Sequence, residues 1–277
     1  MTTTDGSTVR APAPGGQARR GAGPGWRRWS WVGVLAGGLA AYLLVLHTLT
    51  TTKNINFFPS LILIGSITVP VAVLVYAWGA DRHLPLSTGL VVVTAIVGGV
   101  VGTVTAGTLE YDSLRDLGGL PMTGVGIVEE ASKLVVPVII LLLTRPRDPR
   151  PGVIIGVASG MGFATLETMG YGFQSLLSSR GDIAAVDDIL LLRGLLSPAG
   201  HVAWTGLTVA ALWRIPGAAS RGRALMVFAL SYVAAVVLHA TWDGTQTMVL
   251  RVAVVIVSVA VLMTLVRRAH REPVPAT

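Results

Sequence analysis

The 277-residue sequence contains no cysteine, and only 13% of its residues are charged. Without cysteine, the chain forms no disulfide bond and offers no thiolate as a nucleophile or metal ligand. Soluble domains contain about 25% charged residues, whereas this chain is 52% hydrophobic and has a mean hydropathy of +0.68. The composition excludes an ordinary soluble domain and predicts a membrane protein that crosses the bilayer several times.

The first 25 residues lack the apolar core and the cleavage signature of a signal peptide. They are rich in Thr, Gly, Pro and Arg, a composition typical of disordered segments. We therefore predict a disordered, basic cytoplasmic tail over residues 1–28, a membrane domain over residues 29–268 and a second cytoplasmic tail over residues 269–277.

The net charge of +7 would suit a nucleic-acid partner, but the basic residues are concentrated beside apolar runs. Most arginines lie in the two tails and in alternate connections. The other connections carry fewer basic residues and six acidic ones, namely Glu110, Asp112, Asp116, Asp182, Asp187 and Asp188. In membrane proteins, positive charge marks the cytoplasmic side. The pattern predicts cytoplasmic termini, an even number of spans and no binding of nucleic acid.

Eight apolar runs are candidate spans, since a helix needs about 20 apolar residues to cross a bilayer. The predicted fold is therefore an all-α bundle of about eight transmembrane helices. The sixth run is short, and residues 189–198 either extend it or lie at the membrane interface. No internal repeat is visible, which weakens a transporter built from inverted repeats. The runs are residues 31–48, 57–79, 88–108, 122–143, 152–175, 199–213, 224–242 and 246–266.

Three ionisable residues interrupt the fourth run, namely Glu129, Glu130 and Lys133. Each costs roughly 2.5–3.5 kcal/mol in the bilayer core on insertion-based scales, so the helix must place them against protein, a cavity or water. At helical spacing Lys133 lies within reach of both carboxylates, and it should keep at least one of them ionised. The alternative is an ion cluster that only braces helices.

A third glutamate is expected at a similar depth in the fifth span. Glu167 follows a row of small residues that recurs at every fourth position, so it continues a face that packs against another helix. Glu129, Glu130 and Glu167 are each predicted to lie roughly 11 Å below the outer ends of their spans, at 1.5 Å per residue. The small residues are Gly152, Gly156, Gly160 and Ala164.

Two histidines on other spans are expected at the same depth in the bilayer as these glutamates. His201 begins the sixth span at the outside, and His239 and Asp243 close the seventh at the same side. Two imidazoles and a carboxylate can hold Zn²⁺ and leave a position for water, from which a nearby glutamate can take a proton. We expect Asp243 to reach His239 only if the chain bends back after the helix. Arg251, in the eighth span, is expected to extend to the outer surface.

These residues resemble the motifs of the PrsW-type intramembrane metalloproteases, relatives of the CAAX-processing and bacteriocin-immunity proteases. The resemblance covers about residues 120–245, the protease-like core. In that family Asn commonly follows the glutamate of the second motif, whereas this chain has Thr168. In the order of the family, the matching pieces are Glu129-Glu130-Ala131-Ser132-Lys133, Gly162-Phe163-Ala164-Thr165-Leu166-Glu167 with Tyr171, Gly200-His201 and His239-Ala240-Thr241-Trp242-Asp243.

The resemblance implies a protease of the bacterial plasma membrane that cuts a single-span membrane protein near its outer face. Members of the PrsW-type family are associated with site-1 cleavage of an anti-sigma factor. The implied cofactor is a divalent metal, with zinc expected. A metal-free alternative, in which a glutamate activates water and the histidines stabilise the oxyanion, uses the same residues. The predicted catalytic residues are Glu129, Glu130, Lys133 and Asp243, and the predicted metal ligands are Glu167, His201 and His239.

Two other functions compete with the protease, and the sequence gives no oligomeric state. A proton- or cation-coupled transporter would use the glutamates as a relay. Its polar residues should continue to the cytoplasmic side, but the inner halves of these spans are almost wholly apolar. An inactive scaffold that binds a partner's transmembrane helix would keep its effect on that partner when the glutamates are substituted. The distribution of polar residues favours the protease.

Overall fold

The computed structural model describes residues 29–79, 84, 86–118, 121–146 and 148–271. These residues form nine α-helices and two short 3₁₀ helices, with no strand among them. The predicted tail over residues 1–28 and the last six residues lie outside the described part. The α-helices are α1 (Ser30–Thr52), α2 (Phe58–Gly79), α3 (Thr88–Leu117), α4 (Met122–Thr144), α5 (Pro151–Ser178), α6 (Ile183–Leu196), α7 (His201–Leu212), α8 (Arg221–Gly244) and α9 (Met248–Arg271).

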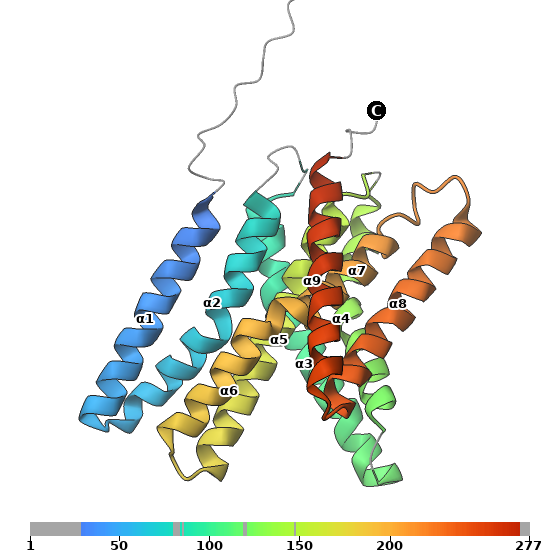
Figure 1. Ribbon diagram of the computed structural model, residues 1–277. Helices are drawn as coiled ribbons and strands as arrows, with labels where there is room; N and C mark the ends of the chain where they lie inside the picture. The colour runs from blue at the N-terminus through green and yellow to red at the C-terminus, as the bar shows by residue number, and fades with distance from the viewer. Residues whose placement is uncertain (1–28, 80–83, 85, 119–120, 147, 272–277) are drawn as a thin grey trace, which may run out of the picture.

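The helices form one bundle in which successive long helices run in opposite directions (Figure 1). Within the described residues, six helices are long and apolar enough to cross a membrane, namely α1, α2, α3, α5, α8 and α9. The fourth helix carries the three charged residues expected from the sequence, and α6 and α7 have only 14 and 12 residues. The protein is therefore an all-helical, multi-pass membrane protein, and the count of eight spans stays a prediction.

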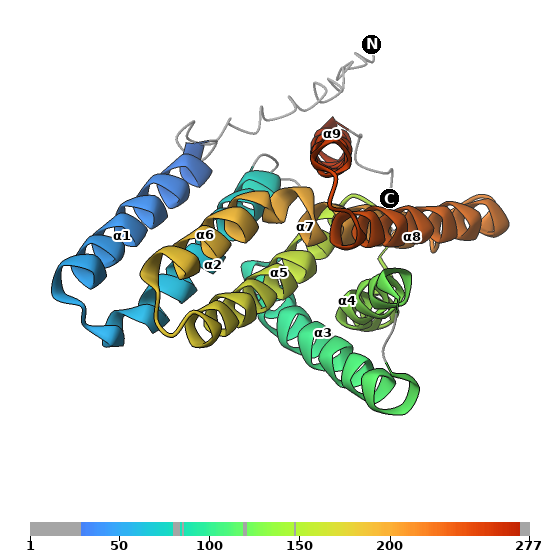
Figure 2. The ribbon, with the colours of Figure 1, turned by 60° about the horizontal axis from the view of Figure 1, so that its bottom comes forward.

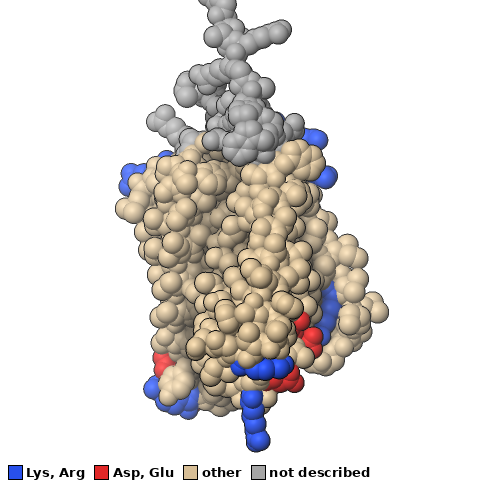
Figure 3. Space-filling model, turned by 90° about the vertical axis from the view of Figure 1, so that its left-hand side faces the viewer, with Lys and Arg blue, Asp and Glu red and all other residues tan. Residues whose placement is uncertain are grey.

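Charged residues gather at the two ends of the bundle. On the face beside α1, Lys, Arg, Asp and Glu lie mainly near the top and bottom, and most of the surface between them is uncharged (Figure 3). The start of α1, the α4–α5 and α7–α8 connections and the end of α9 all lie at the same end (Figure 1). These are the segments in which the sequence concentrates arginine, so the arrangement agrees with the charge pattern. That this end faces the cytoplasm stays a prediction.

The fifth helix is the central element, and the first half of it is buried on all sides (Figure 2). Its small residues allow the backbone of α7 to approach closely. A methyl group on Gly156 would lie 2.7 Å from the carbonyl oxygen of Thr205, and one on Gly160 would lie 2.5 Å from that of His201. The row of small residues predicted to pack against a neighbour therefore does so, and it fixes the start of α7 beside α5.

Residues 189–198 were expected either to extend the sixth span or to lie at the membrane interface, and the polypeptide between α5 and α7 does not extend α7. It forms α6, which begins because the side chain of Asp182 accepts a hydrogen bond from the backbone N–H of Ala184 at 2.9 Å. A 3₁₀ turn and Gly200 then separate α6 from α7, although the two helices run in the same general direction (Figure 1). The break places His201 as the first residue of a helix in the interior of the bundle.

An ion pair lies in the connection between α4 and α5. The guanidinium of Arg150 donates to Asp148, with Nη2 and Oδ2 2.7 Å apart. Burial raises the pKa of Asp148, but the hydrogen bonds and the charge of Arg150 outweigh burial and hold that pKa below its ordinary value. Because Pro151 follows directly as the first residue of α5, this pair fixes the point at which the central helix begins.

Candidate active site

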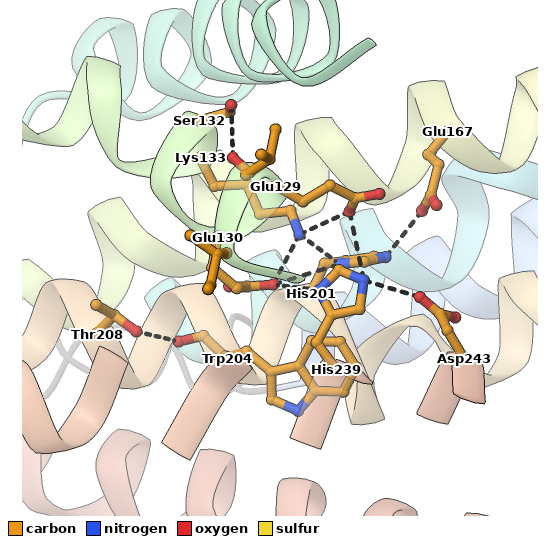
Figure 4. A network of polar contacts seen from close by, with 12 residues as sticks. Glu129, Glu130, Ser132, Lys133, Glu167, His201, Trp204, Thr208, His239 and Asp243 are labelled. Atoms are coloured by element: carbon orange, nitrogen blue, oxygen red, sulfur yellow. Dashed lines mark hydrogen bonds and ion pairs between the residues drawn. The ribbon is translucent and has the colours of Figure 1, made fainter. Parts of the chain in front are cut away.

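The structure brings the seven predicted site residues together from four helices (Figure 4). The fourth helix supplies two glutamates and a lysine, the fifth supplies one glutamate, and α7 and α8 supply the histidines and the aspartate. The shared depth inferred from the sequence thus corresponds to direct contact in space. These residues are Glu129, Glu130, Lys133, Glu167, His201, His239 and Asp243.

Lys133 lies at the centre of the cluster and has no exposed surface. Its Nζ is 2.8 Å from Oε1 of Glu130, 3.2 Å from Oε2 of Glu129 and 2.7 Å from Nδ1 of His201. It also lies 4.1 Å from the centre of the Phe163 ring. A buried ammonium requires such neighbours, because the loss of hydration is offset only by opposite charge and hydrogen bonds.

His239 connects α8 to the two glutamates of α4. Its Nδ1 lies 2.9 Å from Oε1 of Glu130, and its Nε2 lies 3.5 Å from Oε2 of Glu129. The same Nε2 lies 3.0 Å from Oδ2 of Asp243. The expectation that Asp243 needs a bent loop was wrong, because α8 continues past this residue and i,i+4 side chains meet on one face. The ring is also stacked on Trp204, with centroids 5.1 Å apart.

His201 is held from its other side by an ion-pair chain. Its Nε2 lies 2.8 Å from Oε2 of Glu167, and the same oxygen is 2.7 Å from Nη2 of Arg193. The guanidinium of Arg193 lies 3.8 Å from the centre of the Tyr171 ring. Arg193 was not among the predicted site residues. The signal available in the sequence was an arginine inside the apolar second half of α6.

Two aromatic residues were also missed as parts of the site. Trp204 donates from Nε1 to Oγ of Ser258 at 2.9 Å, which fixes the ring that stacks on the histidine of α8. Phe163 has its ring centre 5.2 Å from that of His201. Their positions could have been read from helical spacing, since Trp204 follows His201 by three residues and Phe163 precedes Glu167 by four.

The cluster opens into a cavity of about 190 Å³. Side-chain exposure rises toward it, from 0% at Lys133 to 16% at Glu167 and 32% at Asp243. Thr168, which stands where the family commonly has Asn, also lines this cavity. Arg251 lines it too and donates from Nε to the carbonyl oxygen of Thr245 at 3.2 Å, so it contributes to the cavity wall.

One group of donors in the cluster is compact enough to hold a metal ion. Ligand atoms of Glu129, His201 and His239 all lie within 4.8 Å of one another, and two of the three residues are buried. Two histidines and one glutamate form a donor set used by catalytic zinc sites, which keep a further position for water. The residues therefore fit a divalent metal. Glu167, the carboxylate predicted from the sequence as a ligand, is instead paired with Arg193 and His201.

Fold and site together define a multi-pass membrane protein with a buried cluster of glutamates and histidines that opens into a cavity. A family model described as PrsW family intramembrane metalloprotease matches residues 86–267, about two thirds of the chain. The chain belongs to this family and is an intramembrane protease, for which a divalent metal and a membrane-embedded substrate are implied. The matched residues include the whole predicted site. No curated protein and no solved structure matches the chain.

Proposed function

We propose that this protease hydrolyses a peptide bond of a single-span membrane protein near the extracytoplasmic face of a bacterial plasma membrane. The observation that carries the proposal is the convergence of Glu129, Glu130, His201 and His239, of which His201 lines a cavity. Such a site suits hydrolysis because a water-poor interior strengthens every electrostatic contact to the reacting groups. Because the family is associated with cleavage of anti-sigma factors, an anti-sigma factor is the candidate substrate.

The proposed metal ligands are Glu129, His201 and His239, and zinc is the proposed ion. A divalent metal bound there would polarise the substrate carbonyl group and lower the pKa of water. The compact spacing of these three residues supports Glu129 as the carboxylate ligand. The ion pair of Glu167 with Arg193 supports a different role for Glu167, which is to orient the ring of His201.

Glu130 is the proposed general base. In peptide hydrolysis a water oxygen forms a bond to the carbonyl carbon, the water proton passes to a base, and the C–N bond then breaks as a proton reaches the leaving nitrogen. The carboxylate of Glu130 would accept that proton and return it to the amine. Two basic side chains hold this carboxylate in place. Its Oε1 lies 2.8 Å from Nζ of Lys133 and 2.9 Å from Nδ1 of His239. Asp243 would orient His239 through its 3.0 Å contact.

The proposal is tested by sequencing new protein N-termini in membranes of cells that produce the wild type or Glu130→Gln. Glutamine keeps the shape of the side chain but accepts no proton, so termini near the outer boundary of single-span proteins should appear only with the wild type. Asp116→Asn, at the exposed end of α3, is the control and should retain them. Identical sets of termini from equally abundant, folded wild type and Glu130→Gln would refute peptide hydrolysis at this site.

A further inference from the structure

Arg251 of α9 lines the cavity onto which part of the proposed site opens. It lines the cavity together with His201 and Asp243. Its Nε donates to the carbonyl oxygen of Thr245, and its guanidinium carbon lies 5.9 Å from the centre of the Trp242 ring. The Nε–H group is thus used within the protein. The N–H groups of the two terminal nitrogens can bind a carboxylate through two parallel hydrogen bonds.

Arg251 differs from the other charged residues of the cavity wall in its partners. Two arginines and two acids line the cavity, and three of these four lie within about 3 Å of a basic or acidic side chain. Arg193 pairs with Glu167 at 2.7 Å, and Asp243 lies 3.0 Å from His239. Within the described part of the chain, no carboxylate lies within ion-pair distance of Arg251. The wall therefore carries an arginine whose charge is not neutralised by any carboxylate of the described residues.

We propose that Arg251 selects the substrate by binding an aspartate or glutamate side chain close to the cleaved bond. The inference rests on the proposed peptide hydrolysis, because the acidic residue reaches Arg251 only when the substrate occupies this cavity. An unpaired arginine in a confined, partly apolar space favours a carboxylate, which it binds through two parallel hydrogen bonds. Because each extended residue spans at most about 3.6 Å, the acid must lie within a few residues of the cleaved bond.

The experiment compares new N-termini in membranes containing the wild type, Arg251→Gln, Arg251→Lys, Arg251→Glu and the control Arg180→Gln. Arg180 is exposed in the α5–α6 connection and does not line the cavity. Termini made by the wild type should be enriched in Asp or Glu within a few residues of the cut. Arg251→Gln should lower their yield about tenfold or more, as expected for losing a charged hydrogen bond. Arg251→Lys should keep the preference, and Arg251→Glu should shift it toward Lys or Arg.

The outcomes separate this inference from the proposed function. If the wild type and Glu130→Gln give identical termini, peptide hydrolysis fails. If the wild type produces termini without acidic enrichment, or Arg251→Gln retains the yield at acidic sites, Arg251 does not select the substrate although hydrolysis stands. A uniform loss at all sites would indicate binding of a lipid phosphate and also overturn the proposal. If Arg251→Gln does not fold, two other results test the proposal. These are the enrichment of Asp or Glu near the cuts made by the wild type and the shift toward Lys or Arg with Arg251→Glu.

Discussion

Nδ1 of His239 on α8 lies 2.9 Å from Oε1 of Glu130 on α4. The two residues are 109 positions apart in the chain, and the same carboxylate oxygen also lies 2.8 Å from Nζ of Lys133. One buried oxygen atom thus joins two helices and two basic side chains. Because a buried charge is stable only beside such partners, the structure of the site and the packing of α4 against α8 depend on each other.

Replacing the central lysine should destabilise the protein strongly. Lys133→Met leaves Glu129 and Glu130 as neighbouring buried carboxylates without their cation, and we expect the free energy of unfolding to fall by roughly 3–5 kcal/mol. Thermal unfolding in detergent measures the change. The double variant Glu130→Gln/Lys133→Met should lose less free energy of unfolding than the two single variants lose in total. Additive effects would show that the two side chains do not interact.

The sequence predicted most helix positions, because a long apolar run forms a helix whether it faces lipid or packs against other helices. The third helix shows the limit. Its apolar run ends near residue 108, but the helix continues to Leu117 because polar residues can extend a helix beyond the apolar layer. The sixth helix was missed as a separate element for a related reason, since its aspartates resemble loop residues although Asp182 caps the helix. Hydropathy alone does not distinguish polar helix ends from loops.

Two glycines of α5 provide a matched test of close helix packing. A methyl group on Gly162 would lie 1.9 Å from the carbonyl oxygen of Ala95 and 3.0 Å from Cα of Gly99, so backbone would have to move. Gly162→Ala should therefore cost about 1–3 kcal/mol or more of stability. Gly170 has open space around it, and Gly170→Ala should be neutral or stabilise the helix by up to about 1 kcal/mol. Equal melting temperatures for the two variants would contradict this packing.

Arg193 is expected to act as a positioning residue. Arg193→Gln removes the cation paired with Glu167, the carboxylate that contacts His201. The rate of cleavage should fall about tenfold or more, since residues that orient a metal-binding histidine typically contribute about 10–100-fold to activity. Arg193→Lys keeps the charge but loses the stacking on Tyr171, and it should restore part of the rate. The measurement is the initial cleavage rate of a substrate identified from the new termini. If glutamine and lysine variants behave alike, the charge at this position does not position His201.

The site was predicted from depth, and its individual contacts were not. Counting residues from the ends of the spans was sufficient to predict that the glutamates and histidines lie at the same depth in the bilayer. It could not show that Glu167 would pair with Arg193, because the arginine lies on a helix that the sequence did not define. The choice between Glu129 and Glu167 as carboxylate ligand also depends on side-chain distances. Residue types indicated the chemistry, and the packing of α4, α5, α7 and α8 determined the partners.

Metal content of the purified, untagged protein tests the proposed site most directly. We expect one divalent ion per chain, zinc, in the wild type and in the control His47→Ala, whose side chain is exposed on α1. His201→Ala and His239→Ala should each lose the ion, because each removes one of three ligands. Elemental analysis of protein that remains folded by thermal unfolding gives the answer. Wild-type metal content in folded His239→Ala would contradict the account.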